Sequence, residues 1–333
     1  MADRPTIRDV AQRAGVSKSL VSLVLRGSEQ VRPDKRAAVE AAVAELGYRP
    51  NAAARSLSER RTRTIGVMLA DLRNPWFVDL LDGLNSVLHD RGLRMLMADS
   101  RLDRRIGADL TAAFLQLQVD GLVAVGTVDD PSALADAAKV LPTVVAGTRE
   151  PAQPWHDVVA NDDEAGTRLA VEHLLALGHR RIAHLAGPGI VGALRESAYR
   201  AALAEHGRTG PASVTRVDGS EESAYRAAVR LLAAADRPSA VVAFNDVCAI
   251  AVMSAAAELG LSVPGDVSVV GYDDTHIARL RHIWLTSVDN ANREVGRRAG
   301  ERLVARLAEP SRPGSLDLSQ PRLHIRGTTA PPR

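Results

Sequence analysis

Cysteine and long apolar runs are scarce in this chain of 333 residues. Cys248 is its single cysteine, so no internal disulfide can form. The longest apolar runs, such as residues 239–244, are far shorter than the roughly 20 residues that span a bilayer. Residues 1–13 alternate charges with single hydrophobes, unlike a secretory leader. We therefore expect a protein of a reducing compartment, the cytoplasm, with no membrane partner.

Motifs of catalysis and cofactor binding are scarce as well. The sequence has no G-x-S-x-G elbow, no P-loop and no H-E-x-x-H pair, and its nine histidines never fall at metal-ligand spacing. The segment 187–192 satisfies G-x-G-x-x-G, but the next acid at a strand end, Asp218, lies beyond the usual distance of about 20 residues. The acids at 162–164 are interpreted as a helix start stabilised by the helix dipole. We expect no enzymatic activity, no cofactor and no metal.

Positive charge is concentrated at the amino terminus. Residues 1–63 contain 13 Lys and Arg against 7 Asp and Glu, a net charge of +6, whereas the remainder carries 29 against 33, a net charge of −4. A basic end on an otherwise acidic chain indicates a polyanionic partner at that end.

Three short helices are predicted in the same segment. Thr6 and Ser17 are placed to cap two helices that Gly15 and Gly27 end, and Pro33 opens a third. A tight turn containing glycine between the first two helices is typical of a helix-turn-helix, whose second helix enters the major groove of DNA. The three helices are expected over 7–14, 17–25 and 33–46.

Several ordered motifs extend this pattern. They are T-I-R-D-V-A at 6–11, A-G-V-S at 14–17, L-G-Y-R-P-N at 46–51, A-R-S-L at 54–57 and T-I-G-V at 64–67. In this order and spacing they resemble the signature of the lactose-repressor (LacI/GalR) family of bacterial transcriptional regulators, and the likeness continues along essentially the whole chain.

The resemblance implies which residues read DNA. The family's base-reading positions fall on Lys18, Ser19 and Leu23 of the second helix. Lys18 offers donors to guanine or to a phosphate, whereas Leu23 offers only apolar contact, most naturally to a thymine methyl. Phosphate contacts, which position a domain without specifying sequence, are expected from Thr6, Ser17, Ser22, Arg26 and Tyr48.

A second DNA element is expected over residues 50–58. Its propensity is helical, but about eight residues are too few for a stable isolated helix in water. The resemblance implies that this hinge folds on the operator, pairs with its dimer mate and enters the minor groove through Asn51, Ala54 and Leu57. Leu57 would be the apolar wedge that opens a base step and kinks the duplex.

From residue 64 onward, apolar strands alternate with helices. This alternation predicts parallel sheets with helices on both faces, long enough for two α/β lobes whose ligands bind beyond the carboxyl ends of the strands. The resemblance adds a periplasmic-binding-protein-like (type I) arrangement with the effector between the lobes. Strands are expected at 64–70, 94–98, 121–125, 143–146, 181–185, 240–244 and 267–271, and helices at 76–90, 164–177, 221–234 and 247–259.

Candidate effector-binding residues come from the resemblance and from position. Arg195, Asp273 and Asn245 match effector-binding positions of the family. A guanidinium facing a carboxylate can hold vicinal hydroxyls, and an amide suits the same groups. Trp76 and Phe77 stand at the first strand–helix turn, where they could stack on a ring. Two residues that follow the first and fourth strands, Asp71 and Arg149, complete the predicted site.

The combined prediction is a DNA-binding transcriptional repressor controlled by a small-molecule effector. Gly219 stands where some relatives place an aromatic over the ligand, which favours a sugar over a purine. A homodimer on a pseudo-palindromic operator is expected, because paired half-sites mirror a two-fold protein. The predicted domains are 1–50 (helix-turn-helix), 51–63 (hinge helix and linker) and 64–333 (effector binding and dimerisation).

Two other classes remain open at this point. A soluble solute-binding protein without DNA function shares the two-lobed fold, but the helix-turn-helix argues against it. A sugar-modifying enzyme on the same fold would need a catalytic constellation, and none is visible in the sequence.

Overall fold

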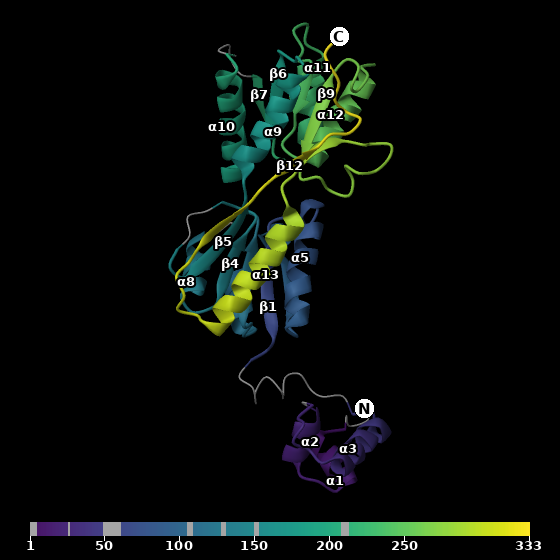
Figure 1. Cartoon of the computed structure of the whole chain (residues 1–333), viewed down its shortest axis with the longest axis vertical. Coiled ribbons are helices and arrows are strands. Elements are labelled where there is room, and N and C mark those ends of the chain that lie inside the picture. Colours follow the sequence, from purple (N-terminus) through teal and green to yellow (C-terminus); the bar gives the residue numbers. More distant parts are fainter. Residues whose placement is uncertain are drawn as a thin grey trace. The chain divides into compact units, whose positions relative to one another are not determined.

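The chain divides into two compact units, Met1–Thr62 and Arg63–Arg333. The computed structural model describes residues 5–25, 27–48, 61–104, 109–127, 131–149, 153–207 and 213–333 (Figure 1). The boundary between the units falls within the linker expected over 51–63. Within the described residues, no helix is long and apolar enough to cross a membrane.

In the part of the first unit that the structure describes, three helices pack around one small core. Val10, Val21 and Val39 come from different helices, are fully buried and belong to one cluster of apolar side chains. This burial stabilises helices that are too short to be stable alone. The helices are α1 (Ile7–Ala14), α2 (Lys18–Leu25) and α3 (Pro33–Leu46).

Caps and glycines set the ends of these helices as the sequence predicts. The backbone N–H of Thr6 donates to the Asp9 carboxylate over 2.7 Å, and the Leu20 N–H donates to Ser17 Oγ over 3.2 Å. Gly15 and Gly47 end α1 and α3 with φ of 63° and 60°. Glycine adopts this left-handed conformation without the steric cost of a Cβ.

The second unit contains two six-stranded sheets, each at the centre of one lobe. The amino lobe has the strand order β11-β5-β4-β3-β1-β2 and the carboxy lobe has β12-β10-β9-β8-β6-β7. All pairs are parallel except β10 with β12. The strands are β1 (Thr64–Leu69), β2 (Arg94–Asp99), β3 (Gly121–Val125), β4 (Thr143–Ala146), β5 (His156–Asn161), β6 (Ile182–Ala186), β7 (Ser213–Arg216), β8 (Ala240–Val242), β9 (Ser268–Tyr272), β10 (Thr286–Asp289), β11 (Leu316–Ser319) and β12 (Arg322–His324).

Helices cover both faces of each sheet, as the alternating pattern predicts (Figure 1). In the amino lobe, α5 and α13 bury one sheet face, and α7 and α8 bury the other. In the carboxy lobe, α11 and α12 bury one face, and α9 and α10 the other. The helices are α5 (Trp76–Asp90), α6 (Ser100–Arg104), α7 (Leu110–Gln116), α8 (Pro131–Ala138), α9 (Asp163–Ala176), α10 (Gly189–Glu205), α11 (Glu221–Leu232), α12 (Asp246–Glu258) and α13 (Asn292–Ala308).

The chain crosses between the two lobes three times. It leaves the amino lobe after β5, returns from β10 into α13, and leaves again from β11 to β12. The strands at the last two crossings, β10, β11 and β12, are three or four residues long and were not predicted, and neither was β5. β10, β11 and β12 are too short to carry periodicity of their own, and pairing with a neighbouring strand is what makes them strands. β5 has six residues, so shortness does not explain why it was missed.

Candidate functional site

A cavity of about 560 Å³ lies between the two lobes of the second unit. Its walls come from segments that follow the carboxyl ends of β1, β3 and β4 in one lobe and of β6, β7, β8 and β9 in the other. This is where open parallel sheets bind ligands. Six of the seven predicted effector-binding residues line the cavity: Asp71, Trp76, Phe77, Arg195, Asn245 and Asp273.

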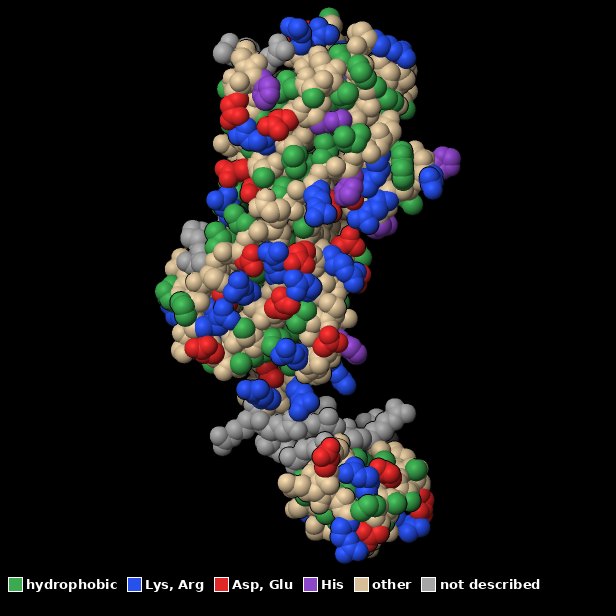
Figure 2. Space-filling model, in the orientation of Figure 1, with side chains coloured by type: hydrophobic (Ala, Val, Ile, Leu, Met, Phe, Trp, Pro, Cys, Tyr) green, Lys and Arg blue, Asp and Glu red, His purple; other side chains and the backbone are tan. Residues whose placement is uncertain are grey.

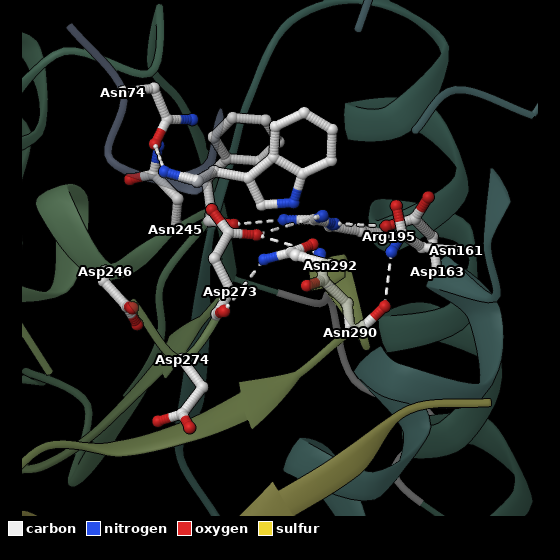
Figure 3. A network of polar contacts seen from close by, with 12 residues as sticks. Asn74, Asn161, Asp163, Arg195, Asn245, Asp246, Asp273, Asp274, Asn290 and Asn292 are labelled. Carbon is white, nitrogen blue, oxygen red and sulfur yellow. Dashed lines mark hydrogen bonds and ion pairs between the residues drawn. The ribbon is translucent and has the colours of Figure 1, made fainter. Parts of the chain in front are cut away.

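Arg195, on α10, lies at the centre of the polar wall (Figure 3). Its Nε donates to Asp163 Oδ1 over 2.8 Å, and Nη1 donates to the Phe244 carbonyl over 2.5 Å. Its Nη2 lies 3.8 Å from Asp273 Oδ1, and the guanidinium lies over the Tyr272 ring, 3.5 Å from its centroid. A buried guanidinium held on four sides keeps one orientation toward a ligand.

Electrostatics couple the three charged groups of this wall. Burial raises the pKa of Asp273 well above its ordinary value, and Arg195 opposes that rise. Burial also raises the pKa of Asp163, again against the field of Arg195. For Arg195, burial would lower the pKa, but the fields of Asp163, Tyr272 and Asp273 raise it, so the arginine stays charged.

Asp273 is fixed by asparagines at the lobe crossings (Figure 3). Asn290 Nδ2 donates to Asp273 Oδ1 over 3.1 Å, and Asn292 Nδ2 donates to the Asp273 carbonyl over 3.2 Å. Asn161 Nδ2 in turn donates to the Asn290 carbonyl. The network therefore connects a cavity residue to two of the three segments that join the lobes.

Aromatic rings form the apolar walls of the cavity. Trp76 and Phe77 meet edge to face, with ring centroids 4.9 Å apart, and each is more than nine-tenths buried. In the opposite lobe, Phe244 fits against Gly187, where a Cβ would overlap its ring, and beside Gly219. Gly187, the first glycine of the G-x-G-x-x-G segment at 187–192, thus makes room for an aromatic ring and not for a pyrophosphate.

Three predicted residues have structural partners that the sequence did not reveal. Asp71 accepts hydrogen bonds from Arg73 and Arg101, and the Arg73 bond chiefly lowers its pKa to about 2. Asn245 caps α12, because its Oδ1 accepts from the Cys248 N–H over 2.8 Å. Arg149 is not among the residues that line the cavity and instead pairs with Glu164 over 2.6 Å.

Sequence reasoning missed Asp163, Phe244 and the three asparagines. Asp163 was assigned to a helix-start cluster, and this is true of its neighbour Asp162, which accepts from the Ala165 N–H. The Asp163 side chain is buried instead on Arg195, a partner 32 residues away. Only its place directly after a strand of the sheet could have indicated this role.

The predicted DNA-reading residues of the first unit lie on the outer face of its bundle. Val21 and Val24 turn the inner face of α2 into the core, which leaves Lys18, Ser19 and Leu23 exposed to solvent. Ser17 and Thr6 are also exposed, and Ser22 and Tyr48 are half-buried. Four predicted residues lie outside the described residues: Arg26, Asn51, Ala54 and Leu57.

Comparisons with known proteins match both units. Residues 6–51 match the model of bacterial regulatory proteins of the lacI family, and residues 171–329 match a periplasmic binding protein-like domain. The chain is 32% identical over 326 residues to the repressor PurR of Photobacterium profundum, covering 96% of this chain and 97% of that one. It belongs to the lacI family. It is also 33% identical over 327 residues to the ribose operon repressor of Escherichia coli, covering 96% of each.

Solved structures of lacI-family regulators share the fold of both units. The lac repressor dimer bound to operator and the anti-inducer ONPF gives a TM-score of 0.85 at 30% identity, covering 98% of this chain and 100% of that one. The regulator CelR in complex with cellobiose gives 0.72 at 31% identity, with the same coverage. The predicted family and fold class are confirmed, and the family is one of transcriptional regulators, not of enzymes.

Proposed function

We propose that this protein is a transcriptional repressor of the cytoplasm whose affinity for operator DNA is set by a sugar or sugar-like effector. One observation carries the proposal: a helix-turn-helix unit and a two-lobed unit with a polar cavity belong to one chain. Two distinct sites coupled through one protein are the requirement for allosteric control.

The cavity has the groups that hold a polyhydroxylated ring. Asp273 and Asn245 offer acceptors and donors to hydroxyl groups, and Arg195 offers donors from a fixed plane. The rings of Trp76 and Phe77 present apolar surface to a sugar face. Two relatives support this ligand class, the ribose operon repressor by its name and CelR by its bound cellobiose.

DNA would be read by the exposed face of α2. We assign base contacts to Lys18, Ser19 and Leu23, and phosphate contacts to Thr6, Ser17, Ser22, Arg26 and Tyr48. Residues Asn51, Ala54 and Leu57 would form the hinge element in the minor groove, with Leu57 as the wedge. The lac repressor dimer on its operator supports this arrangement as a relative of known structure.

A homodimer would cover an apolar edge of the amino lobe. β2 is the outermost strand of its sheet, and Met97 on this strand is 50% exposed. Leu72 and Leu102 lie nearby, since the backbone N–H groups of both donate to the Asp99 carboxylate, and both side chains are about half exposed. An apolar strand at the edge of a sheet favours association with another chain, and in a homodimer a second copy of this chain would bury its exposed side chains.

Effector binding would act through the lobe crossings. A ligand that engages Asp273 also acts on Asn290 and Asn161, which lie on the connecting segments. A change in the relation between lobes would then alter the spacing of the two hinge segments in the dimer and shift their folding equilibrium on DNA.

The decisive experiment measures operator binding with and without effector. Operators selected from a random DNA pool by the full chain should bind it with a strong salt dependence and should not bind a chain lacking residues 1–62. A screen of sugars and nucleobases by thermal shift on the full chain then identifies ligands. A chain that binds a sugar but no DNA would be a solute-binding protein, and turnover of the sugar would make it an enzyme.

A further inference from the structure

The charges around the cavity are unevenly distributed. Four carboxylates line it, from Asp71, Asp218, Glu221 and Asp273, but only two guanidinium groups do, from Arg73 and Arg195. Among the described lining residues, negative charge therefore exceeds positive charge before any ligand enters.

Both guanidinium groups are already matched by acids. Arg195 holds Asp163 at 2.8 Å and lies 3.8 Å from Asp273, so one buried cation faces two carboxyl groups. The Arg195–Asp163 ion pair is buried, and the Asp273 carboxyl group lies beside it, so the guanidinium has no side free of acid for an anionic ligand group. Arg73 Nε donates to both carboxylate oxygens of Asp71, and Nη2 donates to Oδ2.

Two of the helix amino termini at the cavity, those of α11 and α12, are already capped by side chains. Ser220 Oγ accepts from the Ser223 N–H and caps α11, and Asn245 caps α12 in the same way. The first turn of α11 also carries the exposed acids Glu221 and Glu222, and the exposed Asp218 lies just before the helix. The positive end of this helix dipole is already compensated by these carboxylates.

An anionic ligand group would therefore be desolvated without a free cation among the described lining residues to receive it. Desolvating an unpaired charge is costly, and like charges at short distance add to that cost. A hydroxyl group meets no such penalty, and an ammonium group gains a carboxylate partner in Asp273.

We propose that the cavity selects a neutral or amine-bearing sugar and rejects phosphorylated and carboxylated sugars. This proposal rests on the proposed effector function of the cavity and identifies the charge class of its ligand. Asp163 is its determinant, because this carboxylate neutralises the buried arginine that would otherwise attract an anion.

The test compares sugars that differ only in charge. Calorimetry on the full chain uses glucose, glucosamine, glucuronate and glucose 6-phosphate, and ribose with ribose 5-phosphate, at constant ionic strength. Where a neutral or amino sugar binds, its phosphate or acid should bind at least tenfold more weakly. An anionic sugar that binds more tightly than its neutral parent overturns the proposal.

A gain of anion binding tests the role of Asp163 without a known effector. Thermal stabilisation by inorganic phosphate, measured relative to chloride at the same ionic strength, should be larger for Asp163→Asn than for the wild-type protein, because phosphate bound by the DNA-reading unit contributes equally to both. A second variant, Asp218→Asn with Glu221→Gln, changes only exposed acids. It should reduce the difference in affinity between glucose and glucose 6-phosphate. Asp136→Asn, exposed on α8 and outside the cavity, is the matched control.

The sugar and phosphate measurements test the effector class and the charge selectivity of the cavity separately. A folded Asp163→Asn variant that phosphate stabilises no more than it stabilises the wild-type protein overturns the charge assignment. Failure of every sugar to bind would count against the proposed effector class, while the phosphate result would still decide the charge balance.

Discussion

Asp273 has a strained backbone conformation, is buried, and is hydrogen-bonded to a segment that joins the lobes. Its φ of 99° lies in a region that non-glycine residues rarely adopt, and its side chain is 4% exposed. Such a conformation costs on the order of 1–3 kcal/mol and persists only where surrounding contacts enforce it. The bonds from Asn290 and Asn292 provide that enforcement. The strain is therefore placed at the residue that we assign to effector binding.

Asp273→Ala should abolish the response to effector and leave operator affinity nearly unchanged. The substitution removes the carboxylate that faces the cavity, while the DNA-reading helix belongs to the other unit. The measurement is operator affinity with and without the ligand found in the screen. Asp82→Ala, exposed on α5, serves as the control. A normal response in the Asp273 variant would remove this residue from the site.

His184 makes the second unit sensitive to acid. It is buried on β6, where burial lowers its pKa to about 4, its Nδ1 donates to the Val242 carbonyl, and Nε2 has no partner among the described groups. The pKa of His184 in the folded state lies below its unfolded value, so folding is favoured while the imidazole is neutral. This contribution to the free energy of unfolding is complete above about pH 6.5 and is lost as the pH falls toward 4; it amounts to about 3 kcal/mol.

His184→Phe should flatten the dependence of unfolding free energy on pH between about 4 and 6.5. Phenylalanine keeps a ring beside Tyr199, which stacks on His184 at 5.2 Å, but it does not titrate. Urea unfolding at several pH values measures the slope, and His89→Gln, at an exposed site on α5, is the control. An unchanged slope would show that other buried histidines account for the acid sensitivity.

At the scale of elements, α5 and α13 pack backbone to backbone. A Cβ at Gly296 would overlap the carbonyl oxygen of Leu80, and a Cβ at Gly83 would overlap that of Arg293. The two glycines allow the helices to approach closely on one face of the amino-lobe sheet. Ion pairs then cover the outer face of α13, where acidic and basic side chains intermix (Figure 2).

Gly296→Ala should destabilise the second unit by roughly 1–3 kcal/mol, because the added methyl forces two helix backbones apart. Denaturant unfolding measures this loss. Glu301→Ala, on the exposed face of the same helix, should change stability by less than about 1 kcal/mol, since surface ion pairs contribute little. Equal effects of the two variants would contradict the close approach at Gly296.

At the scale of the whole molecule, the apolar edge at β2 is the place where we expect a second copy to bind. Met97→Glu should weaken the dimer by about 2 kcal/mol or more, because a charge would be buried in an apolar contact. Operator affinity should fall with it, since two half-sites are read together. Sedimentation measures the assembly. Val140→Glu, at a site 75% exposed beyond α8, is the control, and an unaltered dimer in the Met97 variant would place the interface elsewhere.

Local signals in the chain were sufficient for most elements. Caps, glycines and periodicity predicted α1, α3 and α5 with their observed ends, because these signals act over one or two helical turns. The short strands at the lobe crossings escaped prediction, since neighbours distant in sequence define them. The ordered motifs also identified the family, which the comparisons confirm.

The composition of the cavity wall depended on contacts between distant residues. Residue type and position brought Arg195 and Asp273 into the predicted site, but nothing local indicated that Asp163 neutralises the arginine or that Phe244 fills the space beside two glycines. Parallel sheets bring many strand ends to one edge, and which side chains meet there is a matter of long-range packing. The class of protein was therefore readable along the chain, whereas the charge of its binding site emerged only from the folded lobes.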